Sequence, residues 1–154
     1  YALTLLGLIY VVLPGTFLIA VALGRTLTKS KETLKKSFSA FAYALVPLGL
    51  MAWIAFSLSF VFASLSYLWP ALRDPLGAGW NLFGTAHVAW QPYLMSIVPF
   101  LQASVLIGGL LWACIVARRV AAEKQAGRGI TLQALPVMGF CFIITIGLME
   151  LLIG

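Results

Sequence analysis

The run FAYALVPLGLMAWIAFSLSFVFASLSYLW, residues 41–69, carries no charged side chain and decides the class of this protein. The hydrocarbon core of a bilayer is about 30 Å thick, and about 20 helical residues are needed to cross it. Because the run is longer than that, it predicts a transmembrane helix that tilts or projects beyond the bilayer.

Three further apolar runs occupy residues 2–23, 93–117 and 135–153. Together the four runs predict an all-α integral membrane protein with four transmembrane helices, built as a single domain over residues 1–154. Pro14, in the middle of the first run, predicts a kink. Pro136 is expected in the first turn of the last helix, where proline is tolerated.

The composition agrees with the membrane class. The chain has 154 residues, of which 62% are hydrophobic and only 9% are charged. A soluble domain needs a charged, solvated surface, and its apolar content is usually about half. The net charge of +6 does not indicate a nucleic-acid partner, because the basic residues border apolar runs. They fit an anionic membrane surface, so the first predicted partner is the lipid bilayer.

Positive charge gathers in two polar segments, residues 24–38 and 118–133, which hold all but one of the ten Lys and Arg residues. Short basic loops stay on the cytoplasmic side of a membrane. We therefore expect these two loops to be cytoplasmic and both termini to be extracytoplasmic, in a multi-pass protein of the bacterial cytoplasmic (inner) membrane. The connection over residues 70–92 is then an outer loop.

This outer loop is unusually aromatic for a connection in water. It contains Trp80 and Trp90, and Tyr67, Trp69 and Tyr93 lie at its borders. Trp and Tyr side chains favour the headgroup level of a membrane. The pattern predicts a loop that lies on the outer membrane surface; the alternative is that it packs against another subunit.

The candidate chemistry is sparse and lies on the predicted outer side. His87 is the only imidazole, so the chain alone cannot supply the two axial histidines of a haem between helices. A structural role at the interface, a metal ion shared with a partner and a contact to a quinone headgroup all remain open for it. A quinone or metal site at the outer face would combine His87, Trp90, Gln91 and Glu150, with His87 as the metal ligand. The default expectation is that this chain alone binds no cofactor.

Glu150 is the one carboxylate within a predicted span. Ionisable groups in membranes are costly and often functional. Pairing with Arg73 of the outer loop would satisfy the carboxylate, and a proton or quinol role is the alternative.

Other polar and small residues in the spans indicate helix packing. Gln91 and Gln102 are expected to form hydrogen bonds across helices, and Gly108 and Gly109 to allow close contact. Small hydroxyl side chains in the second run offer a similar surface: Ser57, Ser59, Ser64 and Ser66. Polar residues are too few to line a path across the membrane, which disfavours a transporter component.

Three stretches resemble a known family: residues 41–60, FAYALVPLGLMAWIAFSLSF, residues 74–85, DPLGAGWNLFGT, and residues 98–110, VPFLQASVLIGGL. They are similar to the C-terminal membrane region of bacterial polyferredoxin-type proteins, the NapH/NosR-like membrane proteins with 4Fe–4S motifs. The resemblance implies electron transfer at the cytoplasmic membrane, in service of a periplasmic metalloenzyme or its maturation. The family's cluster cysteines lie in segments that this chain does not contain.

Two alternatives follow from that departure. The chain is either the anchor portion of a longer protein, with iron–sulfur motifs upstream of Tyr1, or a relative that has lost its clusters. In both cases we expect an anchor or accessory subunit of a respiratory or other redox membrane complex, which docks a periplasmic or membrane partner and is not catalytic alone. A quinone- or metal-binding electron-transfer subunit is the first alternative function, and a small transporter component is the second.

Overall fold

The computed structural model describes residues 6–30, 32–73, 79 and 95–153, and within these ranges every regular element is a helix. The elements are a π-helical turn η1 (Leu8–Val12), α2 (Leu13–Thr28), α3 (Leu34–Ala42), α4 (Leu45–Arg73), α5 (Val98–Ala122) and α6 (Arg128–Ile153). Four helical segments are long and apolar enough to cross a membrane: Ile9–Thr28, Leu34–Leu65, Val98–Ala122 and Arg128–Ile153. The predicted all-α, multi-pass class is thereby confirmed.

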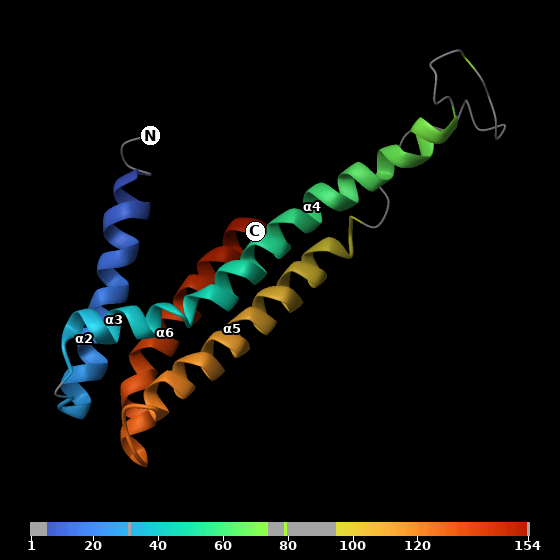
Figure 1. Cartoon of the computed structure of the whole chain (residues 1–154). Coiled ribbons are helices and arrows are strands. Elements are labelled where there is room, and N and C mark those ends of the chain that lie inside the picture. The colour runs from blue at the N-terminus through green and yellow to red at the C-terminus, as the bar shows by residue number, and fades with distance from the viewer. Residues whose placement is uncertain (1–5, 31, 74–78, 80–94, 154) are drawn as a thin grey trace.

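The helices form an open row in the order α2, α6, α5, α4. Helix α5 packs against α4 on one side and α6 on the other, and α6 packs in turn against α2 (Figure 1). The short helix α3 crosses between α2 and α4, so the first two spans of the chain lie at opposite ends of the row (Figure 1). The row therefore leaves α2 and α4 each with a long side that no other described helix packs along.

Small residues line the buried face of α5 and let its neighbours approach. Gly109, Ala113, Ala117 and Ala121 are buried and recur at every fourth position. Residues four apart share one face of a helix, and small side chains on that face allow backbones to come close. Large apolar side chains such as Leu111 point outward instead, as expected for a helix surrounded by lipid.

The contact between α2 and α6 depends on a glycine. A Cβ atom added to Gly24 would lie 2.5 Å from the backbone oxygen of Gln133. Farther along the same pair, the rings of Phe17 and Phe140 lie 5.3 Å apart, and Phe17 also meets Phe38 of α3 at 5.2 Å. The two helices are thus antiparallel and closest at the end where α2 finishes.

Both basic segments are more helical than the sequence suggested. Helix α2 continues past Leu23 to Thr28, and α3 forms an amphipathic helix of nine residues over 34–42, on which Lys35 and Lys36 are exposed. Helix α5 continues to Ala122 and α6 begins at Arg128. Lys and Arg are good helix formers, and their long side chains reach the headgroup level from a helix end. The two basic connections between helices are therefore shorter than the sequence predicts.

Two prolines show how the helices accommodate a missing N–H group. The π-helical turn of η1 ends at Val12, immediately before the turn that holds Pro14, so the backbone changes geometry where a kink was predicted. Pro136 lies inside α6 and not in its first turn, because that helix already begins at Arg128. The carbonyl of Leu132 consequently has no proline N–H to accept from.

Candidate functional site at the basic end of the bundle

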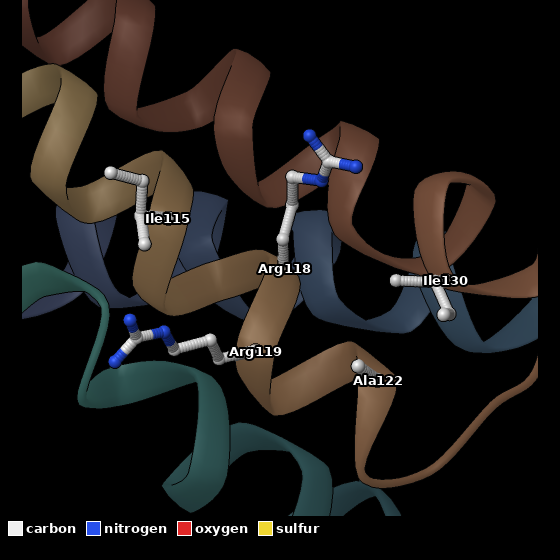
Figure 2. Close-up of a pocket in the computed structure, with 5 residues that line it drawn as sticks. All are labelled: Ile115, Arg118, Arg119, Ala122 and Ile130. Atoms are coloured by element: carbon white, nitrogen blue, oxygen red, sulfur yellow. The ribbon is translucent and has the colours of Figure 1, made fainter.

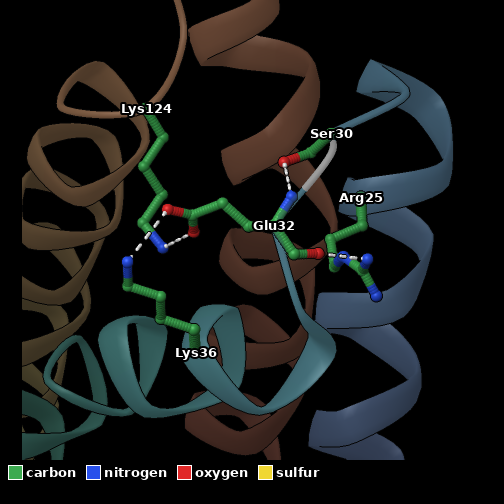
Figure 3. Close-up of polar contacts among 5 residues, drawn as sticks. All are labelled: Arg25, Ser30, Glu32, Lys36 and Lys124. Atoms are coloured by element: carbon green, nitrogen blue, oxygen red, sulfur yellow. Dashed lines mark hydrogen bonds and ion pairs between the residues drawn. The ribbon is translucent and has the colours of Figure 1, made fainter.

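The two basic segments meet at one end of the bundle. Lys124, just after α5, places its Nζ atom 2.5 Å from Oε2 of Glu32, which lies between α2 and α3 (Figure 3). Lys36 of α3 approaches the other carboxylate oxygen at 4.0 Å. The Glu32–Lys124 ion pair joins segments that are far apart in the sequence, so both segments lie at the same end of the helix bundle.

Backbone geometry fixes Glu32 in this position. Lys29 ends α2 in the left-handed conformation, with φ of 49°, and the N–H of Ser30 donates to the carbonyl of Arg25 at 3.2 Å. The Arg25 guanidinium reaches forward and donates to the backbone carbonyl of Glu32 (Figure 3). The chain is therefore folded back on the end of α2 before α3 begins.

The charge around Glu32 stabilises its ionised form. The hydrogen bond from Lys124 is the main cause that lowers the pKa of the Glu32 carboxyl below its usual value, and the positive charges of Lys124, Lys36 and Arg25 add to it. Partial desolvation opposes the effect. The Lys124 side chain is itself only 12% exposed, so the amine is held in place by packing as well as by charge.

Two polar side chains close to this end are buried without a partner among the described residues. They are the hydroxyl of Ser37 on α3 and the amide of Gln133 on α6, both 0% exposed. Buried amides are costly when unpaired. Neither residue was singled out from the sequence, although a glutamine at the edge of an apolar run is a detectable signal.

Basic side chains outnumber acidic ones at this end. The described cations are Arg25, Lys29, Lys35, Lys36, Arg118, Arg119, Lys124 and Arg128, against two carboxylates, Glu32 and Glu123. Since Glu32 is already engaged, the surplus charge can attract anions. Arg118 and Arg119 line a shallow groove of α5 together with Ile115, Ala122 and Ile130 (Figure 2).

The predicted outer site is not assembled by the described residues. His87, Trp90 and Gln91 lie outside them, and Glu150 is an exposed residue near the end of α6. The side chain of Arg73, its predicted partner, is also outside the described set. Within the described ranges, no group of three or more His, Cys, Asp and Glu residues could hold a metal ion. The quinone and metal hypotheses therefore stay predictions.

The predicted contact of Gln102 across helices is confirmed. Its Nε2 donates to the backbone oxygen of Ala55 at 2.9 Å and to the hydroxyl oxygen of Ser59 at 2.9 Å, both on α4. Gly109 packs against Met51 of the same helix, whereas Gly108 faces open space. Gln102 and Gly109 thus pack α5 on α4, whereas the close contact predicted at Gly108 is not present.

The comparisons with known proteins leave the family open: no family model, curated protein or solved structure matches the chain.

Proposed function

We propose that this chain is a membrane-anchor or accessory subunit of a redox complex in the bacterial cytoplasmic membrane, and that it holds a partner by helix packing. The observation that carries the proposal is the open row of helices. Helices α2 and α4 both contact α6, but they do not pack along each other (Figure 1). A further helix is needed to close the row into a bundle, and a partner subunit can supply it.

A hollow between α2 and α4 has the shape and chemistry for such a helix. Its floor is α6, and its lining is apolar: Leu13, Leu45, Leu48, Gly49, Ala52, Phe140, Ile144 and Leu148. Its volume is about 140 Å³, close to that of an engineered cavity of about 150 Å³ that holds benzene. One large apolar side chain of a partner helix therefore fits inside it.

Small residues on α4 favour a helix over a lipid chain as the occupant. Gly49 and Ala52 lie three residues apart, on one face of α4, and nothing lies within 4 Å of a Cβ added to Gly49. Helices in membranes associate through such small-residue faces, because backbones can then approach closely. Lipid tails gain no comparable advantage from a glycine.

The redox part of the proposal rests on the resemblance to polyferredoxin-type membrane proteins. Two of the stretches that carry it, residues 41–60 and 98–110, include residues that join α4 to α5. Ala55 lies in the first, and Gln102 and Gly109 lie in the second. The similar stretches thus contain residues of the α4–α5 contact, which supports a helical framework shared with that family.

The orientation is also part of the proposal. The basic end, with Glu32 and Lys124, would face the cytoplasm by the positive-inside rule. The far ends of α4 and α5 would then face the periplasm, beside the aromatic segment over residues 70–92. A partner helix in the hollow and a periplasmic redox protein on that segment would contact opposite regions of the chain.

The experiment is isolation of the tagged chain from native membranes in a mild detergent, with subunit stoichiometry by mass spectrometry and a visible absorption spectrum. The expected product contains a partner in fixed ratio that carries a redox chromophore. A Gly49→Leu variant should lose that partner, because leucine fills the hollow. Gly108→Leu is the matched control, since this open glycine does not line it. A single uncomplexed species, or equal retention in both variants, would overturn the proposal.

A further inference from the structure

The groove on α5 at the basic end joins a charged region to an apolar one. Ile115, Arg118, Arg119 and Ala122 line it from α5, and Ile130 lines it from α6 (Figure 2). On α5 these positions lie three or four residues apart, so they share one face of the helix. The groove is open to the surroundings and both arginines are exposed.

The two arginines are not neutralised within the protein. In the described part of the chain, neither guanidinium group has a hydrogen-bond or ion-pair partner, whereas Lys124 and Lys36 both lie against Glu32. In Figure 2 the Arg118 side chain extends towards α6, whereas the Arg119 side chain extends away from α6. They flank the groove, and each is free to turn towards an anion bound in it.

Apolar side chains continue from the groove towards the middle of the membrane. Ile107, Leu111 and Ile115 follow one another at intervals of four residues, and they are 46%, 59% and 50% exposed. This stripe ends at the two arginines. The face of α5 therefore has an apolar tail region and a cationic head region, in the same order as an anionic phospholipid in a membrane.

We propose that this face of α5 binds one anionic phospholipid. The phosphodiester is held by the guanidinium groups of Arg118 and Arg119, which match phosphate oxygens in pairs. An acyl chain runs along Ile115, Leu111 and Ile107. A free phosphate ion would use the arginines alone and would gain nothing from the stripe, which is why a lipid is the ligand that the surface fits. This inference does not depend on the redox function.

The test uses the purified full chain in detergent micelles, with native mass spectrometry to count and rank bound lipids. The probes are phosphatidylglycerol and phosphatidylcholine with identical acyl chains. We expect one phosphatidylglycerol to bind at least about tenfold more tightly than phosphatidylcholine, as two basic groups at a membrane surface would give. The double variant Arg118→Gln and Arg119→Gln should lose this preference, while Ile115→Gln should weaken the binding of both lipids.

The control is Arg128→Gln, which removes one positive charge at the same end but does not line the groove. It should leave the preference intact. Equal loss in Arg128→Gln and in the single variant Arg118→Gln would show a general charge effect and overturn the site. Displacement of phosphatidylglycerol by millimolar inorganic phosphate would show that the arginines take a free anion, which would also overturn the lipid assignment.

Discussion

Gln102 of α5 donates two hydrogen bonds through its Nε2 atom, one of them to the backbone oxygen of Ala55 on α4 at 2.9 Å. The glutamine is only 1% exposed, so this amide lies inside the helix pair. It is the one buried polar contact between two spans that the described residues show outside the basic end.

Replacing this glutamine should weaken the pairing of α4 and α5. Gln102→Leu removes both bonds, and interhelical hydrogen bonds in membranes contribute about 0.6 kcal/mol, up to about 2 kcal/mol. We expect a loss of that size in the free energy of unfolding, measured by denaturation in mixed micelles. Ser104→Ala is the control, because the Ser104 hydroxyl bonds only to the Phe100 carbonyl of its own helix. An equal effect in both variants would contradict the role given to Gln102.

The adjacent glycines of α5 should respond in opposite directions. Gly109→Ala places a Cβ atom 2.7 Å from Cβ of Met51, whereas Gly108→Ala meets nothing within 4 Å. Overpacking costs about 1–3 kcal/mol, while an open helical glycine replaced by alanine gains about 0.5–1 kcal/mol. Thermal unfolding of the two variants in the same detergent checks this. A stable Gly109→Ala protein would show that the contact is not tight.

A second glycine pair tests the packing of α2 on α6. Gly24→Ala brings a Cβ atom against the rigid backbone of Gln133, so we expect a loss of stability at least as large as that of Gly109→Ala. Gly15→Ala, on the same helix and facing open space, should be neutral or stabilising. The measurement is again the Tm in detergent. If Gly24→Ala matched Gly15→Ala, the described approach of the two helices would be wrong.

The Glu32–Lys124 ion pair should make stability depend on pH in acid. The folded pKa of Glu32 lies below its usual value of 4.5. The carboxylate therefore contributes its full stabilisation above about pH 4.5 and loses it as the pH falls through the folded pKa. The Tm of the wild-type protein should fall more steeply below pH 4.5 than that of Glu32→Gln.

Glu123→Gln is the control for this pH dependence, because the described residues give Glu123 no ion pair. Its Tm should follow the wild-type curve. Parallel curves for the wild type and Glu32→Gln would mean that the ion pair does not stabilise the folded state.

The two basic segments should be accessible from one side only. We would label single cysteines at Thr33 and Ala126, in a background of Cys114→Ala and Cys141→Ala, with a membrane-impermeant reagent on intact cells. Both positions are exposed and close to the Glu32–Lys124 pair. Labelling only after permeabilisation is expected for a cytoplasmic basic end. Met95→Cys, in the turn that precedes α5, should label without permeabilisation.

Most of the fold was predictable from the spacing of apolar runs, because a lipid-facing helix needs about 20 apolar residues whatever it packs against. Helix ends were not, because Arg25 and Arg118 look like loop residues by polarity but lie within α2 and α5. The order of helices in the row was also hidden. That order depends on where α3 packs between α2 and α4, and its contacts with them cannot be read from the sequence.

The candidate site shows the same division. Gln102 and Gly109 could be found because polar and small residues stand out in an apolar run. The Glu32–Lys124 ion pair could not, since it joins positions far apart in the sequence and no local pattern relates them. Likewise, the apolar stripe of Ile107, Leu111 and Ile115 could not be predicted, because the sequence does not show which side of α5 is exposed.

The most direct test of the proposed role is a photo-crosslinking amino acid at Gly49, in the hollow between α2 and α4, introduced in native membranes. A covalent adduct with one defined membrane polypeptide is predicted there, and no such adduct is predicted from the same probe at Gly108. The adduct should also disappear when Ala52→Phe fills the hollow. Crosslinks from Gly49 to lipid alone, or the same polypeptide captured from both positions, would contradict the partner-helix role.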